Sequence, residues 1–182
     1  MIIFLGVTGS GKSLQGKLLA DEFGYVWIST GDILRALITG EKRRNMLTGK
    51  LINDDEMIRI IGKFFESIDL KQQLILDGFP RSIVQTDWLI QQSRTGAFEL
   101  TAIIQFDVSE AVVHDRLTKR CRPDDTEESI NKRFEEYNSV TMPIIEHFQS
   151  EGYKVIKIDA DKDPQTIHQN VVAVLDDITG KT

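Results

Sequence analysis

A glycine-rich stretch near the start of the chain has the residue types and the spacing that bind phosphate. Its sequence, GVTGSGKSLQ over residues 6–15, fits the pattern G-x-x-x-x-G-K-[ST]. Glycines let the backbone turn its N–H groups towards an anion, and a lysine such as Lys12 can reach the β- and γ-phosphates. Ser13 opens the helix expected next, and a helix N-terminus favours negative charge. The stretch predicts a nucleoside triphosphate site and leaves the second substrate open.

Short apolar segments and longer helical patterns alternate along the chain, and these elements must position the glycine loop. The expected strands are Ile2–Leu5, Tyr25–Ser29, Gln73–Asp77, Ala102–Asp107 and Lys154–Ile158. Each is short and almost continuously apolar, which is typical of parallel strands covered on both faces. Helices are expected at 12–23, 31–39, 54–68, 82–95, 109–119, 126–150 and 164–178. The alternation predicts an α/β three-layer sandwich with a five-stranded parallel sheet flanked by helices.

Two prolines bear on the expected helices. Pro164 suits the first turn of a helix, where its missing N–H is not needed. Pro143 falls inside the 126–150 pattern, where proline lacks the N–H and clashes with the preceding turn. A kink or break is therefore expected at Pro143.

Composition argues against several classes of function. The chain has 182 residues, which suits one domain, and a net charge of −6, which disfavours a general nucleic-acid binder. Cys121 is the single cysteine, so no internal disulfide or paired-cysteine zinc site is expected, and the default setting is reducing and cytoplasmic. No apolar run is long enough to span a membrane, so no membrane partner is expected. Positive charge for phosphate must therefore be concentrated locally.

Two further stretches indicate what the nucleotide site serves. They read STGDILR over residues 29–35 and DGFPRSIVQ over residues 77–85. With the glycine loop, in this order and spacing, they closely resemble the nucleoside monophosphate kinase family, and most closely its adenylate kinases. The resemblance extends from Ile2 to about Leu175. It implies that the three-layer sandwich is a P-loop kinase fold.

The resemblance implies a pocket for AMP. Arg35 and Arg81 would hold the AMP phosphate, because a planar guanidinium pairs with two phosphate oxygens. Thr30 would contact the adenine, and Gln85 would recognise its hydrogen-bonding edge, since an amide offers a donor and an acceptor. The full set implied for AMP binding comprises Thr30, Arg35, Lys50, Leu51, Ile52, Gly78, Phe79, Pro80, Arg81, Gln85, Arg122 and Arg133.

The same pocket bears on the choice of base. Related kinases for UMP or CMP tend to carry alanine in place of Thr30 and asparagine in place of Gln85. This chain has the adenine-type residue at both positions, so AMP is the expected acceptor. A UMP/CMP-type monophosphate kinase stays as an alternative.

An arginine-rich stretch later in the chain would serve ATP and the transferred group. The resemblance implies that Arg116 packs against the ATP base and that three arginines close over the transferring phosphoryl group, where positive charge and alignment are needed. The residues implied for ATP binding are Gly9, Ser10, Gly11, Lys12, Ser13, Leu14, Arg116, Arg120 and Lys162. The implied catalytic set is Lys12, Arg81, Arg120, Arg122 and Arg133.

The chain departs from the family pattern at the lid. Family members usually have a longer segment between the arginines that match Arg120 and Arg122, whereas here only Cys121 separates them. A minimal lid is therefore expected over 119–125, and it should exclude water from the phosphoryl group less completely than a longer one. Residues 30–58 would form a moving AMP-binding helical insert within a single domain.

The glycine loop departs from the family pattern at two places. Thr8 stands where adenylate kinases usually have proline, and Lys-Ser-Leu at 12–14 replaces the usual Lys-Gly-Thr. The second change removes a hydroxyl at Leu14 and adds one at Ser13, the position that binds Mg²⁺ in most other P-loop proteins. Ser13 is therefore expected to take part of the metal or phosphate contact. The resemblance implies that Asp77 acts on Mg²⁺ through water.

The sequence favours a monomeric kinase that transfers the γ-phosphoryl group of ATP to AMP, reversibly yielding two ADP, with Mg²⁺. A nucleotide-binding protein with weak turnover is a second alternative, because the lid is so short. A kinase for a small metabolite such as shikimate is disfavoured, because it predicts neither STGD…R nor DGFPR…Q.

Overall fold

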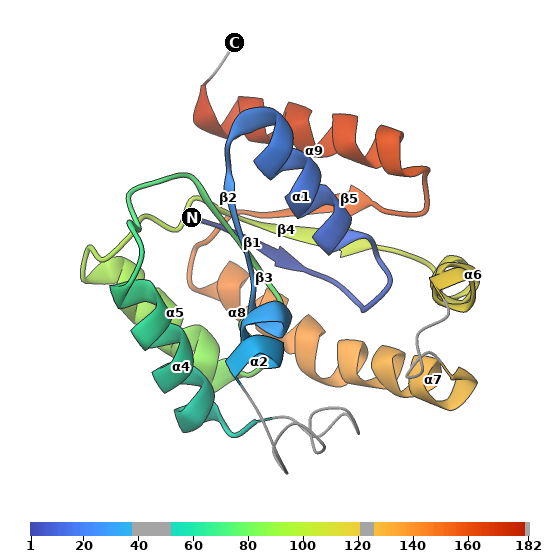
Figure 1. The fold of residues 1–182 in the computed structure, drawn as a ribbon, viewed down its shortest axis with the longest axis horizontal. Coiled ribbons are helices and arrows are strands. Elements are labelled where there is room, and N and C mark those ends of the chain that lie inside the picture. Colours follow the sequence, from blue (N-terminus) through green and yellow to red (C-terminus); the bar gives the residue numbers. More distant parts are fainter. Residues whose placement is uncertain (38–51, 121–125, 181–182) are drawn as a thin grey trace.

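Five parallel strands form the centre of the molecule in a computed structural model that describes residues 1–37, 52–120 and 126–180. The strands are β1 (Ile2–Leu5), β2 (Val26–Ser29), β3 (Leu74–Asp77), β4 (Ala102–Asp107) and β5 (Val155–Asp159). Their order across the sheet is β2-β3-β1-β4-β5 (Figure 1). The predicted α/β sandwich with a five-stranded parallel sheet is confirmed.

Helices connect the strands and cover the sheet. They are α1 (Lys12–Phe23), α2 (Thr30–Leu37), α4 (Asp54–Glu66), α5 (Ile83–Arg94), α6 (Glu110–Arg120), α7 (Glu127–Glu136), α8 (Met142–Ser150) and α9 (Pro164–Thr179). Where a predicted helix matches one helix and the structure describes both ends, the limits differ by two residues at most, whereas the predicted 126–150 helix is divided between α7 and α8. Positions 38 and 39 of the predicted 31–39 helix lie outside the described residues. Within the described ranges, no helix is both long enough and apolar enough to cross a membrane.

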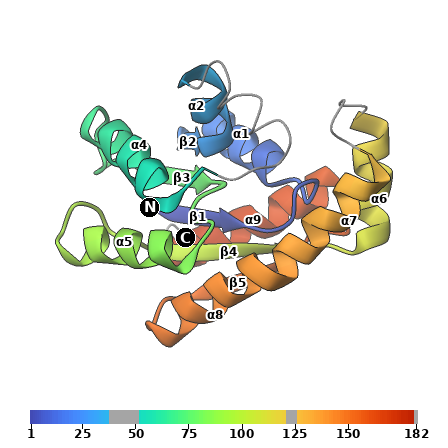
Figure 2. The same ribbon diagram turned by 90° about the horizontal axis from the view of Figure 1, so that it is seen from below.

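Successive side chains of each strand enter two different cores. Ile3 of β1 packs with apolar residues of α4, α5 and α8, whereas its neighbour Phe4 packs with those of α1 and α9. Figures 1 and 2 show α1 and α9 together on one face of the sheet and α4, α5 and α8 on the other. The central strands β1, β3 and β4 are buried on both faces, so their sequences are almost continuously apolar, whereas the edge strand β5 exposes Lys157 and Asp159.

A third, smaller core joins the glycine loop to α6 and α7. Val7 packs there with Val113 and Leu117 of α6 and with Ile130 of α7. Gly9, with φ +96°, lies so close to α6 that an added Cβ would be 3.0 Å from Cγ of Leu117. This packing orients the phosphate-binding loop relative to the two helices that carry the arginine-rich stretch.

The two prolines behave largely as predicted. Pro164 is the first residue of α9, and the side chain of Asp163 accepts hydrogen bonds from the next two N–H groups. Before Pro143, the chain widens into a π-helical turn, η1 (Tyr137–Thr141), in which the N–H of Met142 donates to the carbonyl of Tyr137. Pro143 then lies in the first turn of α8. The expected break is a local change of hydrogen-bonding pattern between two helices.

Two glycines inside helices test the packing described here. A Cβ at Gly16 of α1 would lie 2.2 Å from Cδ1 of Trp27, whereas at Gly62 of α4 the nearest atom would be Cζ2 of Trp88 at 3.7 Å. Gly62→Ala should raise the free energy of unfolding by about 0.5–1 kcal/mol, because alanine is the better helix former. Gly16→Ala should lower it by about 1–3 kcal/mol, because the indole must move. Urea denaturation measures both, and stabilisation by Gly16→Ala would contradict the α1–β2 packing.

Candidate functional site

The carboxyl ends of three neighbouring strands bring most of the predicted residues to one edge of the sheet. β1 leads into the glycine loop and α1, β2 leads into α2, and β3 ends at Asp77. Because β3 lies between β2 and β1, the loop that follows it lies between the other two. Parallel α/β sheets bind ligands at this edge, so the topology agrees with the predicted nucleotide site.

Asp77 ties these three loops together. The hydroxyl of Ser13 donates to its carboxylate oxygen Oδ2 at 2.6 Å, and the buried hydroxyl of Thr30 donates to its backbone oxygen at 3.1 Å. Gly78 has φ +87°, and an added Cβ would lie 2.7 Å from Oγ1 of Thr30. The triphosphate loop and the predicted acceptor pocket are therefore joined through one residue.

The ammonium group of Lys12 is held by its own loop. Its Nζ donates to the carbonyl oxygens of Gly6 at 2.7 Å and Val7 at 2.9 Å, and to Oγ of Ser10 at 3.3 Å. The helix that starts at Lys12 has no capping side chain at Gly11 and no acidic residue in its first turn. The first N–H groups of α1 and a nearby cation thus form the surroundings that an anion requires.

Burial changes the acidity of this lysine. Desolvation lowers the pKa of Lys12 to about 8, although the Asp77 carboxylate raises it, and Arg81 lowers it further. Lys12 is therefore mostly charged at neutral pH and loses its proton in mildly alkaline solution. A bound polyphosphate would favour the charged form and raise the pKa again.

Arg116 of α6 bridges two parts of the predicted ATP site. Its Nη2 donates to the backbone oxygen of Lys162 at 2.8 Å, and its Nη1 donates to that of Ser10 at 3.4 Å. The ammonium of Lys162 lies 3.5 Å from Oδ2 of Asp159 and is exposed. Arg116 thus connects the glycine loop to the loop after β5, which carries Lys162, one of the residues implied for ATP binding.

A second contact fixes the same loop from the side of α1. The buried side chain of Gln15 donates from Nε2 to the backbone oxygen of Pro164 at 2.9 Å. Sequence reasoning did not single out Gln15, which lies two residues after the end of the phosphate-binding pattern. Its role is visible only once α1 and α9 are packed together.

The two arginines predicted to hold the AMP phosphate share one electrostatic environment. Nε of Arg81 donates to the backbone oxygen of Gly78 at 3.0 Å, and Arg35 forms an ion pair with Asp32, whose pKa this hydrogen bond lowers. Desolvation lowers the pKa of Arg81, the carboxylate of Asp77 raises it, and the positive charge of Arg35 lowers it. As whole residues, Arg35 and Arg81 both lie at the protein surface.

The Gln85 side chain is buried, and its amide is engaged at both ends. Its Oε1 accepts from the backbone N–H of Arg81 at 2.8 Å, and its Nε2 donates to Oδ1 of Asp54 at 2.7 Å. Ser82 also donates to this Asp54 oxygen, at 2.8 Å. Sequence reasoning missed Asp54, whose surroundings in the sequence signal only the start of a helix.

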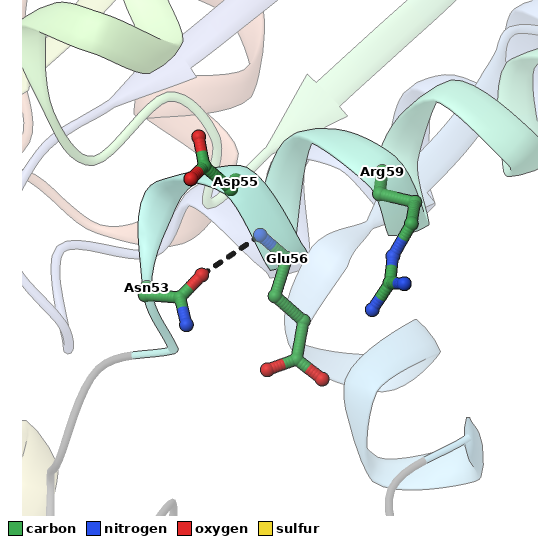
Figure 3. Close-up of a pocket in the computed structure, with 4 residues that line it drawn as sticks. All are labelled: Asn53, Asp55, Glu56 and Arg59. Carbon is green, nitrogen blue, oxygen red and sulfur yellow. Dashed lines mark hydrogen bonds between the residues drawn. The ribbon is translucent and has the colours of Figure 1, made fainter.

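The start of α4 shows why the sequence around Asp54 indicated a helix start and gave no sign of the contact with Gln85. Asn53 accepts from the N–H of Glu56 at 2.9 Å and so caps the helix, as Figure 3 shows. With Asp55 and Arg59, these side chains line an open hollow of about 380 Å³. A run of polar residues before an apolar pattern is ordinary capping chemistry, and nothing in it points to Gln85.

The other predicted residues fall into two groups. The described ones occupy different places: Leu14 is exposed, Phe79 and Pro80 are buried, Ile52 packs against the core beside α4, Arg120 ends α6 and Arg133 lies on α7. The remaining predicted residues, Lys50, Leu51 and Arg122, lie outside the described residues, as does most of the expected lid at 119–125.

The low pKa of Lys12 predicts a proton uptake that accompanies ATP binding in alkaline solution. At pH 8.5 much of Lys12 is neutral in the free protein, so binding of the phosphates should draw in a proton. Affinity should then fall by up to about tenfold per pH unit above pH 8. Calorimetric titrations in buffers of different ionisation enthalpy measure this uptake. Lys12→Arg, which stays charged, should abolish it, and equal uptake in both proteins would contradict the assignment to Lys12.

Known proteins are similar to this chain over nearly its whole length. The family model for adenylate kinase matches residues 4–153. The adenylate kinase of Corynebacterium aurimucosum is 35% identical over 179 residues, which covers 95% of this chain and 97% of that protein. The adenylate kinase of Corynebacterium urealyticum is 33% identical, with coverage of 96% and 98%, and adenylate kinase 1 of Nostoc sp. is 34% identical, with coverage of 96% and 97%. This chain therefore belongs to the adenylate kinase family.

Proposed function

We propose that this chain is an ATP:AMP phosphotransferase, which converts ATP and AMP into two ADP and works with Mg²⁺. The observation that carries the proposal is the pair of hydrogen bonds from Ser13 and Thr30 to Asp77, which join the triphosphate loop to the acceptor pocket. Family membership over nearly the whole chain supports it. Phosphoryl transfer needs two substrates held in line, and adjacent loops of one sheet edge suit that need.

The proposed reaction depends on positioning and charge. An oxygen of the AMP phosphate forms a bond to the γ-phosphorus of ATP, while the bond from that phosphorus to the β–γ bridging oxygen breaks and ADP leaves. The attacking phosphate is already anionic, so no general base is required. Lys12 and Arg81 supply positive charge from the described part of the site, and Arg120, Arg122 and Arg133 are proposed to complete it.

The proposed Mg²⁺ contacts are a direct one from Ser13 and one through water from Asp77. Their oxygens lie 2.6 Å apart, and hydroxyl and carboxylate oxygens are ligands that Mg²⁺ accepts. Mg²⁺ usually keeps several waters and binds substrate phosphates, so two protein groups suffice. When bound with ATP, the ion would neutralise charge on the phosphates. Ser13 and Asp77 would orient it and its waters.

The proposed acceptor is AMP, and the proposed setting is a monomer in the cytoplasm. The adenine-type residues Thr30 and Gln85 support AMP, and the relatives compared are named adenylate kinases, so the UMP/CMP alternative is not favoured. The single Cys121 and the net charge of −6 support a reducing compartment without a nucleic-acid partner. A panel of monophosphates in a coupled ADP assay distinguishes the acceptors, and measurable turnover excludes a protein that only binds nucleotide.

Removal of the Arg81 guanidinium should abolish most turnover without unfolding the protein. Arg81→Ala should lower kcat by about 10²–10³-fold, because a cation is lost where charge develops. Arg94→Ala is the matched control. Arg94 is the last residue of α5, the helix that begins two residues after Arg81, and it pairs with Glu151 at 2.7 Å. The control should keep the rate of the parent protein. A normal rate in Arg81→Ala would contradict the proposed phosphate contact.

The proposed Mg²⁺ contact of the Ser13 hydroxyl can be tested by removing this hydroxyl and then placing one at position 14. Ser13→Gly should raise the Mg²⁺ concentration that gives half-maximal rate by about tenfold, because one oxygen ligand is lost. Adding Leu14→Thr to this variant restores the usual Lys-Gly-Thr and should recover much of the Mg²⁺ response. The measurement is the rate against Mg²⁺ at fixed nucleotide. An unchanged Mg²⁺ response in Ser13→Gly would rule out the proposed contact.

A further inference from the structure

Two groups with fixed hydrogen-bonding roles hold the amide of Gln85. The backbone N–H of Arg81 can only donate, and it faces Oε1 at 2.8 Å. The ionised carboxylate of Asp54 can only accept, and it faces Nε2 at 2.7 Å. Turning the amide over would bring two donors together and two acceptors together. The orientation of the Gln85 amide is therefore determined by its neighbours.

Asp54 is itself held in place. Its Oδ1 also accepts from the hydroxyl of Ser82 at 2.8 Å, and Oγ of Ser82 in turn accepts from the backbone N–H of Gln85 at 3.1 Å. Asp54 is the first residue of α4, where the helix dipole favours a carboxylate. The half-buried Asp54 thus forms a firm connection between α4 and the start of α5.

We propose that Asp54 is a positioning residue that determines base specificity by locking the amide of Gln85 in one orientation. The proposal rests on the proposed contact between Gln85 and the acceptor base. After the contacts within the protein, Nε2 keeps one hydrogen and Oε1 keeps one lone pair. A purine held by its phosphate meets a donor at one fixed place and an acceptor at another.

Adenine and hypoxanthine present opposite patterns to such an amide. Adenine donates from its amino group and accepts at the adjacent ring nitrogen, whereas hypoxanthine accepts at its carbonyl and donates from the ring. AMP and IMP therefore need the two opposite orientations of Gln85, although their sugar and phosphate are the same. A locked amide accepts AMP and rejects IMP, because a mismatched buried polar pair is costly.

The test is the ratio of kcat/KM for AMP to kcat/KM for IMP, with ATP as the donor. In Asp54→Asn the new side chain can donate as well as accept. If the Gln85 amide turns over, its Oε1 can then accept from this side chain, and only the contact between two donors at Arg81 stays unfavourable. The ratio should fall by about tenfold or more. A purely structural defect would lower both kcat/KM values by the same factor and leave the ratio unchanged, and that result would overturn the proposal.

Asp55→Asn is the matched control. It removes the same charge from the next position of α4, and Figure 3 shows the exposed Asp55 pointing away from Glu56. Its AMP/IMP ratio should equal that of the parent protein, and an equal fall in both variants would show a general charge effect and overturn the lock.

Gln85→Ala separates this proposal from the one on which it rests. If Gln85→Ala keeps the AMP/IMP ratio, the base contact of Gln85 is wrong and the lock fails with it. If Gln85→Ala lowers the ratio and Asp54→Asn does not, only the lock is wrong. Where turnover falls below detection, the ratio of the dissociation constants for AMP and IMP, from calorimetric titration, replaces the kinetic ratio.

Discussion

The hydrogen bond from Ser13 to Asp77 is the contact on which the rest of the site depends. It joins α1 to the last residue of β3, so it fixes the first turn of α1 relative to the loop that carries Arg81. The backbone oxygen of the same aspartate holds Thr30, at the end of β2. The negative charge of Asp77 also stabilises two nearby cations. Desolvation lowers the pKa of Lys12 and of Arg81, and the Asp77 carboxylate raises both. One carboxylate thus organises geometry and charge together.

The fold was predictable because burial on both faces leaves a strong mark on the sequence of a parallel strand. Where the predicted limits of a strand are wrong, the error lies at its ends, where side chains do not decide which residues pair in the sheet. Tyr25 is buried, but its N–H donates to Leu19 at the end of α1, and the sheet begins only at Val26, which donates to Gln73. Pro143 predicts the loss of one helical N–H, but nothing in the surrounding sequence specifies the π-helical turn that precedes it.

A candidate site could be predicted where its residues belong to one short motif. Lys12 and Ser13, or Arg81 and Gln85, follow each other closely in the chain, and a local pattern can identify them. The pair of Asp54 and Gln85 is different, because it forms only when α4 packs against α5. No local pattern reports a contact of this kind, so Asp54 could be found only in the folded chain.

The changed glycine loop places a hydroxyl at Ser13, one position earlier on the helix than in the usual Lys-Gly-Thr. Side chains at neighbouring positions of an α-helix point about 100° apart. Hydroxyls at positions 13 and 14 therefore face in different directions. Here Ser13 faces Asp77, whereas Leu14 is 45% exposed. With glycine at 13, Asp77 would have no hydroxyl partner on α1 at that position and would depend on solvent or on bound ligand. The substitution therefore gives the free protein a direct bond between the first turn of α1 and the end of β3, and the candidate site is partly organised before nucleotide arrives.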